Sequence, residues 1–146
     1  MAENPDEAAE RIGRKTQRIL WASGIGFAGW QVAYFVLYAG MEPRHRTVDK
    51  VTAVAFLAWC AALLFLLATG GGAFAGRETR EIIDDELARA QRASAYRNAF
   101  WAMMGIGFAG YVLAQFTAVT SLHLAHATMS AGILVAVLTL ALLGRR

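Results

Sequence analysis

Several kinds of residue are scarce or missing in this sequence, and their absence excludes several classes of protein. Cys60 is the only cysteine among the 146 residues, which excludes an internal disulfide and a metal centre built from cysteines. Four long apolar stretches contain no Asp, Glu, Lys or Arg, so the chain lacks the ionisable residue of a coupled proton or ion pump. Once these stretches are placed in a membrane, the remaining residues form no Ser-His-acid triad, no pair of catalytic carboxylates and no phosphate-binding loop. We therefore expect a protein without catalytic activity and without a cofactor.

The apolar content is far above that of a soluble domain. Hydrophobic residues make up 57% of the chain and the mean hydropathy is +0.40, which is more apolar side chain than a soluble domain of this length can bury. The apolar stretches approach the roughly 20 helical residues that cross a bilayer, and they lie at 20–39, 51–68, 100–120 and 124–143. They lack the polar alternation of barrel strands. The sequence predicts one all-α membrane domain over residues 1–146, with four transmembrane helices in the lipid bilayer.

Basic residues are distributed unevenly among the segments that flank these spans. They gather before the first span, between the second and third, and at the end of the chain (Arg11, Arg14, Lys15, Arg18, Arg77, Arg80, Arg89, Arg92, Arg97, Arg145 and Arg146). Only Arg44, Arg46 and Lys50 follow the first span, and none lies between the third and fourth. Cytoplasmic segments carry the excess of Lys and Arg, so we expect both termini in the cytoplasm and the protein in a bacterial inner membrane. The chain starts with acids instead of the bases of a signal peptide, so the first stretch should remain as a span.

One six-residue segment occurs twice. Gly-Ile-Gly-Phe-Ala-Gly occupies 24–29 and recurs unchanged at 105–110. Six consecutive identities indicate an internal duplication, with repeats at about 1–70 and about 77–146. Each repeat holds two spans, so both enter the membrane in the same orientation and are related by an axis along the membrane normal. The predicted fold is a four-helix transmembrane bundle built from two parallel two-helix repeats, with cytoplasmic helical extensions.

The glycines of the duplicated segment fit helix packing better than a cofactor site. Their spacing matches the dinucleotide fingerprint, but that motif also needs a preceding strand and an acid about 20 residues later, and neither is present. In a membrane helix, small residues four positions apart let two backbones approach closely. We expect the glycine face of the first repeat to pack on that of the second, or alternatively on another copy of the protein. The residues concerned are Gly24, Gly26, Gly29, Gly105, Gly107 and Gly110.

A charged helix is expected at the start of each repeat. Residues 78–98 have apolar side chains at helical spacing, with acids first and bases later, which complements the helix dipole. The N-terminal segment has the same order of charges. An acidic cluster attracts a basic partner, although a solvated helix face explains the same charges. The candidate docking residues for a cytoplasmic partner are Asp84, Asp85, Glu86, Arg89 and Arg92.

Polar residues in or near the spans have two interpretations each. Three histidines lie near the expected outer surface, where they could share a metal or sit at the level of the lipid headgroups; we expect no metal at His45, His123 and His126. Other polar residues could line a path for a solute or could form hydrogen bonds between helices. These are Gln31, Gln115, Thr52, Thr117, Thr128 and Ser130.

The segment 84–104 resembles a recurring segment of small bacterial four-span membrane proteins of unknown function. In those proteins an acidic-Glu-Leu/Arg motif, followed by Arg and Ala, leads into a span, as Asp-Asp-Glu-Leu-Ala-Arg-Ala-Gln-Arg-Ala does here from residue 84. The resemblance covers roughly the second half of the chain and brings no catalytic residue. Such proteins are often encoded beside small helix-turn-helix regulators of the Xre type, which implies a shared regulatory unit.

These observations leave three functional hypotheses open. The leading one is a non-enzymatic membrane regulator that binds or sequesters a cytoplasmic partner, such as a helix-turn-helix transcription factor. The alternatives are a small transporter or channel subunit, and an accessory scaffold subunit of a membrane complex. We expect no direct contact with nucleic acid, because the bases form no stripe with interleaved aromatics and suit anionic lipid headgroups better.

Overall fold

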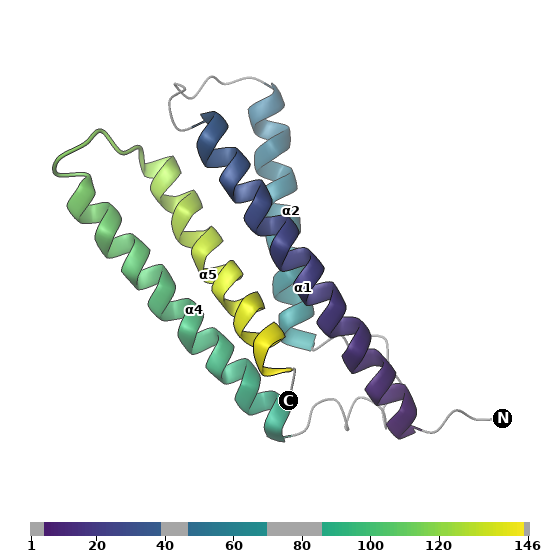
Figure 1. Ribbon diagram of the computed structural model, residues 1–146. Helices are drawn as coiled ribbons and strands as arrows, with labels where there is room; N and C mark the ends of the chain where they lie inside the picture. The colour runs from purple at the N-terminus through teal and green to yellow at the C-terminus, as the bar shows by residue number, and fades with distance from the viewer. Residues whose placement is uncertain (1–4, 39–46, 70–85, 145–146) are drawn as a thin grey trace.

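The computed structural model describes residues 5–38, 47–69 and 86–144, and their fold is all-α, as predicted. Its four helices are α1 (Pro5–Tyr38), α2 (Thr47–Thr69), α4 (Glu86–Leu113) and α5 (Ser121–Leu143). Figure 1 shows α1 and α4 running in one direction and α2 and α5 in the other. We call the end of the bundle where α1 and α4 begin and α5 ends the basic end. Its described bases are Arg11, Arg14, Lys15, Arg18, Arg89, Arg92 and Arg97.

Three of the helices are long and apolar enough to cross a membrane. The stretches concerned are Glu7–Val36 in α1, Lys50–Thr69 in α2 and Ser121–Leu143 in α5. The helix α4 is not among them. Its apolar part begins at residue 100 and rises about 21 Å, at about 1.5 Å per residue, against a hydrocarbon core about 30 Å thick. By length and composition, the described helices therefore include three candidate membrane spans.

The expected span 100–120 is wrong at its end, because α4 stops at Leu113. Thr120 is the N-cap of α5, with φ −76° and ψ 143°, and its hydroxyl accepts a hydrogen bond from the backbone N–H of His123 at 3.3 Å. An N-cap needs a non-helical backbone, so a helix cannot continue through this residue into α5. Residues 111–120 contain neither Gly nor Pro, so the break could not be predicted from helix-breaking residues.

The helix α5 is the centre of the bundle. It packs against each of the other three described helices, most extensively against α4, and Figure 1 shows it between α4 and α1. Val137 and Ala141 of α5 have no exposed surface. The core around them takes side chains from all four helices: Leu20, Phe27, Phe56, Cys60, Leu63, Leu67, Ala99, Ile133 and Ala136. The packing of this small domain therefore depends on one helix, α5, which contacts the other three described helices.

The two copies of the duplicated segment have different surroundings. Phe27 is 1% exposed, whereas the corresponding Phe108 is 72% exposed. A Cβ added to Gly24 would lie 3.3 Å from Cγ1 of Val137 on α5, whereas one added to the corresponding Gly105 would meet no atom within 4 Å. The prediction that the two glycine faces pack on each other is therefore wrong. The reason is that α5 lies between α1 and α4, so α1 packs against α5 instead of α4.

Candidate functional site

A histidine on α5 lies between two aromatic rings from two other helices. The ring of His126 stacks on Tyr34 of α1 with centroids 4.1 Å apart and an interplanar angle of 19°. It also stacks on Phe56 of α2 with centroids 4.1 Å apart and an angle of 29°. Nε2 of His126 lies 2.7 Å from Oε1 of Gln31 on α1. We call these four residues the histidine node, and they join α1, α2 and α5.

The hydrogen bond in the histidine node has a defined direction. Oε1 of Gln31 can only accept, so Nε2 of His126 donates. Gln31 is 7% exposed and Ser130, one turn further along α5, is 5% exposed. In the described part of the chain, the amide nitrogen of Gln31 and the hydroxyl of Ser130 have no hydrogen-bond partner. A buried polar atom without a hydrogen-bond partner lowers the free energy of unfolding by about 1–3 kcal/mol. The histidine node is therefore a polar and costly feature of an otherwise apolar bundle.

The two described histidines that could have shared a metal make different hydrogen bonds, although both rings lie against Tyr34. Nδ1 of His123 lies 2.8 Å from the hydroxyl of Thr120, within the cap of α5, whereas His126 belongs to the histidine node. His45 lies outside the described residues. Within residues 5–38, 47–69 and 86–144, no group of three or more His, Cys, Asp and Glu side chains is placed to hold a metal ion.

Gln31 and Gln115, two of the polar residues that could have lined a solute path, do not come together. Gln31 lies inside the bundle, whereas Gln115 is exposed in the turn after α4. The hydroxyls of Thr117 and Thr128 donate to the carbonyl four residues earlier, at 3.0 and 2.8 Å. Such bonds satisfy the hydroxyl within its own helix or turn, and the sequence could not distinguish them from bonds between helices.

The packing glycines divide into two groups. Besides Gly24, two of them have a close neighbour: a Cβ on Gly26 would lie 3.6 Å from the ring of Trp59, and one on Gly110 would overlap the side chain of Leu124. The remaining three would meet no atom within 4 Å; they are Gly29, Gly105 and Gly107. The expected role in helix packing thus applies to only part of the repeated motif within this chain.

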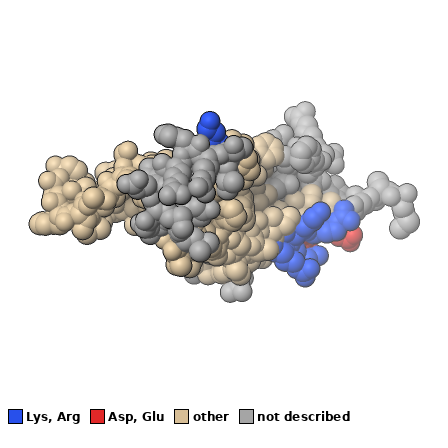
Figure 2. Space-filling view, turned by 90° about the horizontal axis from the view of Figure 1, so that it is seen from above, with Lys and Arg blue, Asp and Glu red and all other residues tan. Residues whose placement is uncertain are grey.

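The candidate docking residues lie at the start of α4. Glu86 is the first residue of that helix, Arg89 is exposed and Arg92 is half-buried. Asp84 and Asp85 lie outside the described residues. Figure 2 shows the molecule from the end opposite to the basic end. Most of the visible basic atoms gather at one edge, beside an acidic group. Uncharged residues cover most of the remaining coloured surface.

Two glutamines tie the charged parts of α1 and α4 to the end of α5. The side-chain amide of Gln17 donates to the carbonyl of Ala141, and that of Gln91 donates to the carbonyl of Leu143, both at 3.4 Å. The last carbonyls of a helix have no partner within the helix, so these amides supply one. Sequence reasoning missed both residues, because an isolated glutamine among charged neighbours gives no signal of its own.

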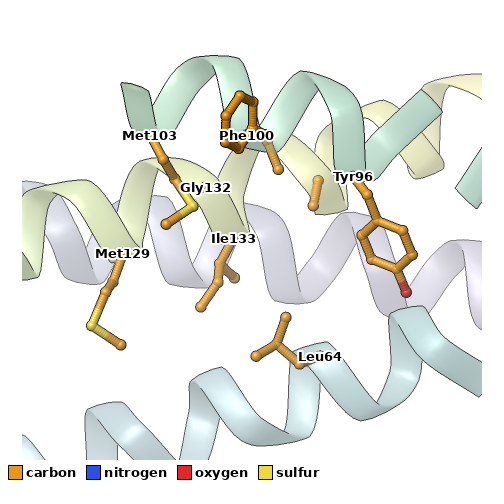
Figure 3. Close-up of a pocket in the computed structure, with 9 residues that line it drawn as sticks. Leu64, Tyr96, Phe100, Met103, Met129, Gly132 and Ile133 are labelled. Carbon is orange, nitrogen blue, oxygen red and sulfur yellow. The ribbon is translucent and has the colours of Figure 1, made fainter. Parts of the chain in front are cut away.

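A side groove opens between α2, α4 and α5, with a cavity of about 310 Å³. Figure 3 shows its lining, in which the only polar atom of a labelled side chain is the Tyr96 hydroxyl, directed from α4 toward α2. Gly132 forms part of the wall, and a Cβ there would lie 2.6 Å from Sδ of Met103. The sequence did not predict this groove. Its principal lining residues are Leu64, Tyr96, Phe100, Met103, Met129 and Ile133.

No family model, curated protein or solved structure matches this chain. The resemblance of 84–104 to bacterial proteins encoded beside helix-turn-helix regulators therefore stays a prediction.

Proposed function

We propose that the protein is a non-enzymatic regulator in a bacterial inner membrane, which binds or sequesters a cytoplasmic partner. The observation that carries this proposal is the continuity of α1 and α4. Each is a single helix that begins with a charged segment and ends in the apolar bundle. Gln17 and Gln91 link the charged parts of both helices to α5. A partner bound at the basic end would therefore act directly on the arrangement of the membrane helices.

The proposed topology has four spans, with both termini and the basic end in the cytoplasm. The helix α4 serves as the fourth span because it packs along α5, which is itself long and apolar enough to cross a membrane. The bases of the described helices support this orientation, since most of them lie at the basic end and Lys50 lies at the opposite end. The common direction of α1 and α4 fits two parallel repeats.

The proposed partner is a basic DNA-binding protein. Three acids precede or begin α4 in the sequence: Asp84, Asp85 and Glu86. Negative charges at the start of a helix also interact favourably with the positive end of the helix dipole. A basic protein would be drawn to such a cluster by long-range attraction. The same basic surface would contact DNA, so binding to the membrane protein would compete with binding to DNA. Sequestration follows from this competition without any chemical step.

The test is binding of the purified full-length protein to a purified helix-turn-helix regulator of the Xre type. Replacing the cluster by Asp84→Asn, Asp85→Asn and Glu86→Gln removes three negative charges and keeps side-chain size. We expect the affinity to fall by about tenfold or more and to become less sensitive to salt. The matched control removes three acids from the start of the chain, through Glu3→Gln, Asp6→Asn and Glu7→Gln, and should bind as the wild type does.

Two outcomes would contradict the proposal at different levels. Equal affinity of the α4 variant and the wild type would refute docking at the acidic cluster. Absence of binding by the wild-type protein would refute the regulator hypothesis for this partner and would favour the transporter or scaffold alternatives.

A further inference from the structure

We propose that the side groove binds an anionic phospholipid, with an acyl chain in the groove and the headgroup at Arg89 and Arg92. This inference does not rest on the proposed function, but it uses Arg89 and Arg92, which are also candidate docking residues for the partner. Three features of the described residues carry it: the alignment of the arginines with the groove, the order of chemical groups along α4, and the charge at the basic end.

The arginines and the groove share one face of α4. Arg89, Arg92, Tyr96, Ala99 and Met103 follow one another at spacings of three and four residues, which places them in a single stripe along a helix. The last three line the groove. The stripe therefore leads from the basic end of the bundle directly into the groove, and Tyr96 lies at the junction between them.

The order of chemical groups along this stripe matches that of a phospholipid. The inner part of the groove is apolar, with Met103 and Met129 at its far end and the hydroxyl of Tyr96 at its near end. One turn before Tyr96 comes the half-buried Arg92. A tyrosine at the boundary between apolar and polar layers is typical of membrane proteins. An acyl chain would meet the methionines and a phosphate would meet the guanidinium groups.

The size and position of the groove suit a lipid from the bilayer. The cavity of about 310 Å³ lies at the lower end of the volumes of small-molecule sites, which run from about 300 to 1,000 Å³. Its walls on α2 and α5 belong to helices that are apolar enough to cross a membrane. Guanidinium groups bind phosphate through paired hydrogen bonds, and basic pockets between membrane helices bind acidic headgroups. An anionic lipid is therefore favoured over a neutral one.

A second copy of the chain fits the same face less well. In a symmetric dimer of parallel copies, each patch meets the same patch of the partner. Arg89 and Arg92 of one copy would then face the same arginines of the other, and like charges repel each other. A lipid phosphate would bring a charge of the opposite sign to these arginines instead. The charge on the stripe thus selects the lipid as the occupant of the groove.

The experiment uses native mass spectrometry of the full-length protein in a neutral detergent, with added phosphatidylglycerol or phosphatidylcholine of the same acyl chains. We expect adducts with phosphatidylglycerol at much lower lipid concentrations than with phosphatidylcholine. Arg89→Gln with Arg92→Gln should weaken phosphatidylglycerol binding about 25-fold, at about fivefold per arginine. The matched control, Lys15→Gln with Arg18→Gln, removes the same charge from α1 and should retain the lipid.

A second variant tests the groove itself. Leu64→Trp adds bulk at a half-exposed position on the groove wall and should reduce binding of both lipids, whereas Val54→Trp on an exposed part of α2 outside the groove should not. The proposal is overturned by equal retention of the two lipids, by retention that neither the arginine variant nor Leu64→Trp changes, or by a dimer mass without bound lipid.

Discussion

Replacing Gly24 with leucine should destabilise the bundle, whereas the same replacement at Gly107 should not. The two glycines lie in the two copies of one identical segment, Gly24 at its first position and Gly107 at its third. A side chain at Gly24 would enter the space against Val137, whose Cγ1 would lie 3.3 Å from the new Cβ, whereas a side chain at Gly107 would enter open space. Overpacking of this kind costs about 1–3 kcal/mol. The gain in helix propensity from Gly to Leu, about 0.5–1 kcal/mol, is common to both variants and cancels when they are compared.

The assay is unfolding of the purified protein in mixed micelles by increasing sodium dodecyl sulfate, followed by tryptophan fluorescence. We expect Gly24→Leu to be less stable than Gly107→Leu by about 1–3 kcal/mol. Equal destabilisation of the two variants would refute the reasoning, because it would mean that Gly107 is packed against another helix. Unchanged stability of Gly24→Leu would refute the close contact between α1 and α5.

Three further predictions concern single contacts, and the same unfolding assay measures each of them. Phe27→Ala should cost about 3–5 kcal/mol because the ring is buried, whereas Phe108→Ala should be nearly silent, and similar losses at both positions would be inconsistent with the fold. His126→Ala should cost about 1–3 kcal/mol because it leaves the buried oxygen of Gln31 unsatisfied; adding Gln31→Leu should restore most of that loss, and no recovery would argue against the bond. Gln17→Ala should lower the free energy of unfolding by about 0.5–1.5 kcal/mol and should speed amide exchange at the end of α5. Unchanged exchange there would contradict the hydrogen bond from Gln17 to Ala141.

The helices could be predicted from the sequence because apolar length is a local property. The expected spans 20–39, 51–68 and 124–143 lie within or almost within α1, α2 and α5. The end of α4 could not be predicted, because the break before α5 depends on capping by Thr120. A threonine hydroxyl serves equally well inside a membrane helix or at its start, and its neighbours in the sequence do not distinguish the two cases.

The candidate sites were harder to predict, because they depend on which helix occupies the centre. The duplicated segment predicted two equivalent glycine faces. Because α5 lies between α1 and α4, the identical residues of the two copies have different neighbours. His126 and Gln31 are 95 residues apart, and no local pattern connects them. The side groove likewise combines Leu64, Tyr96 and Met129 from three helices. Such sites follow from tertiary packing and leave no periodic signal in the sequence.

Reporter fusions that are active on only one side of the membrane test the proposed cytoplasmic location of the basic end. Fusions at residue 146 and within 88–93 should give the cytoplasmic signal, because residue 146 follows the end of α5 in the sequence and 88–93 lies in the first turns of α4. A fusion within 44–49, between α1 and α2, should give the external signal. A cytoplasmic signal from 44–49 would contradict that proposal.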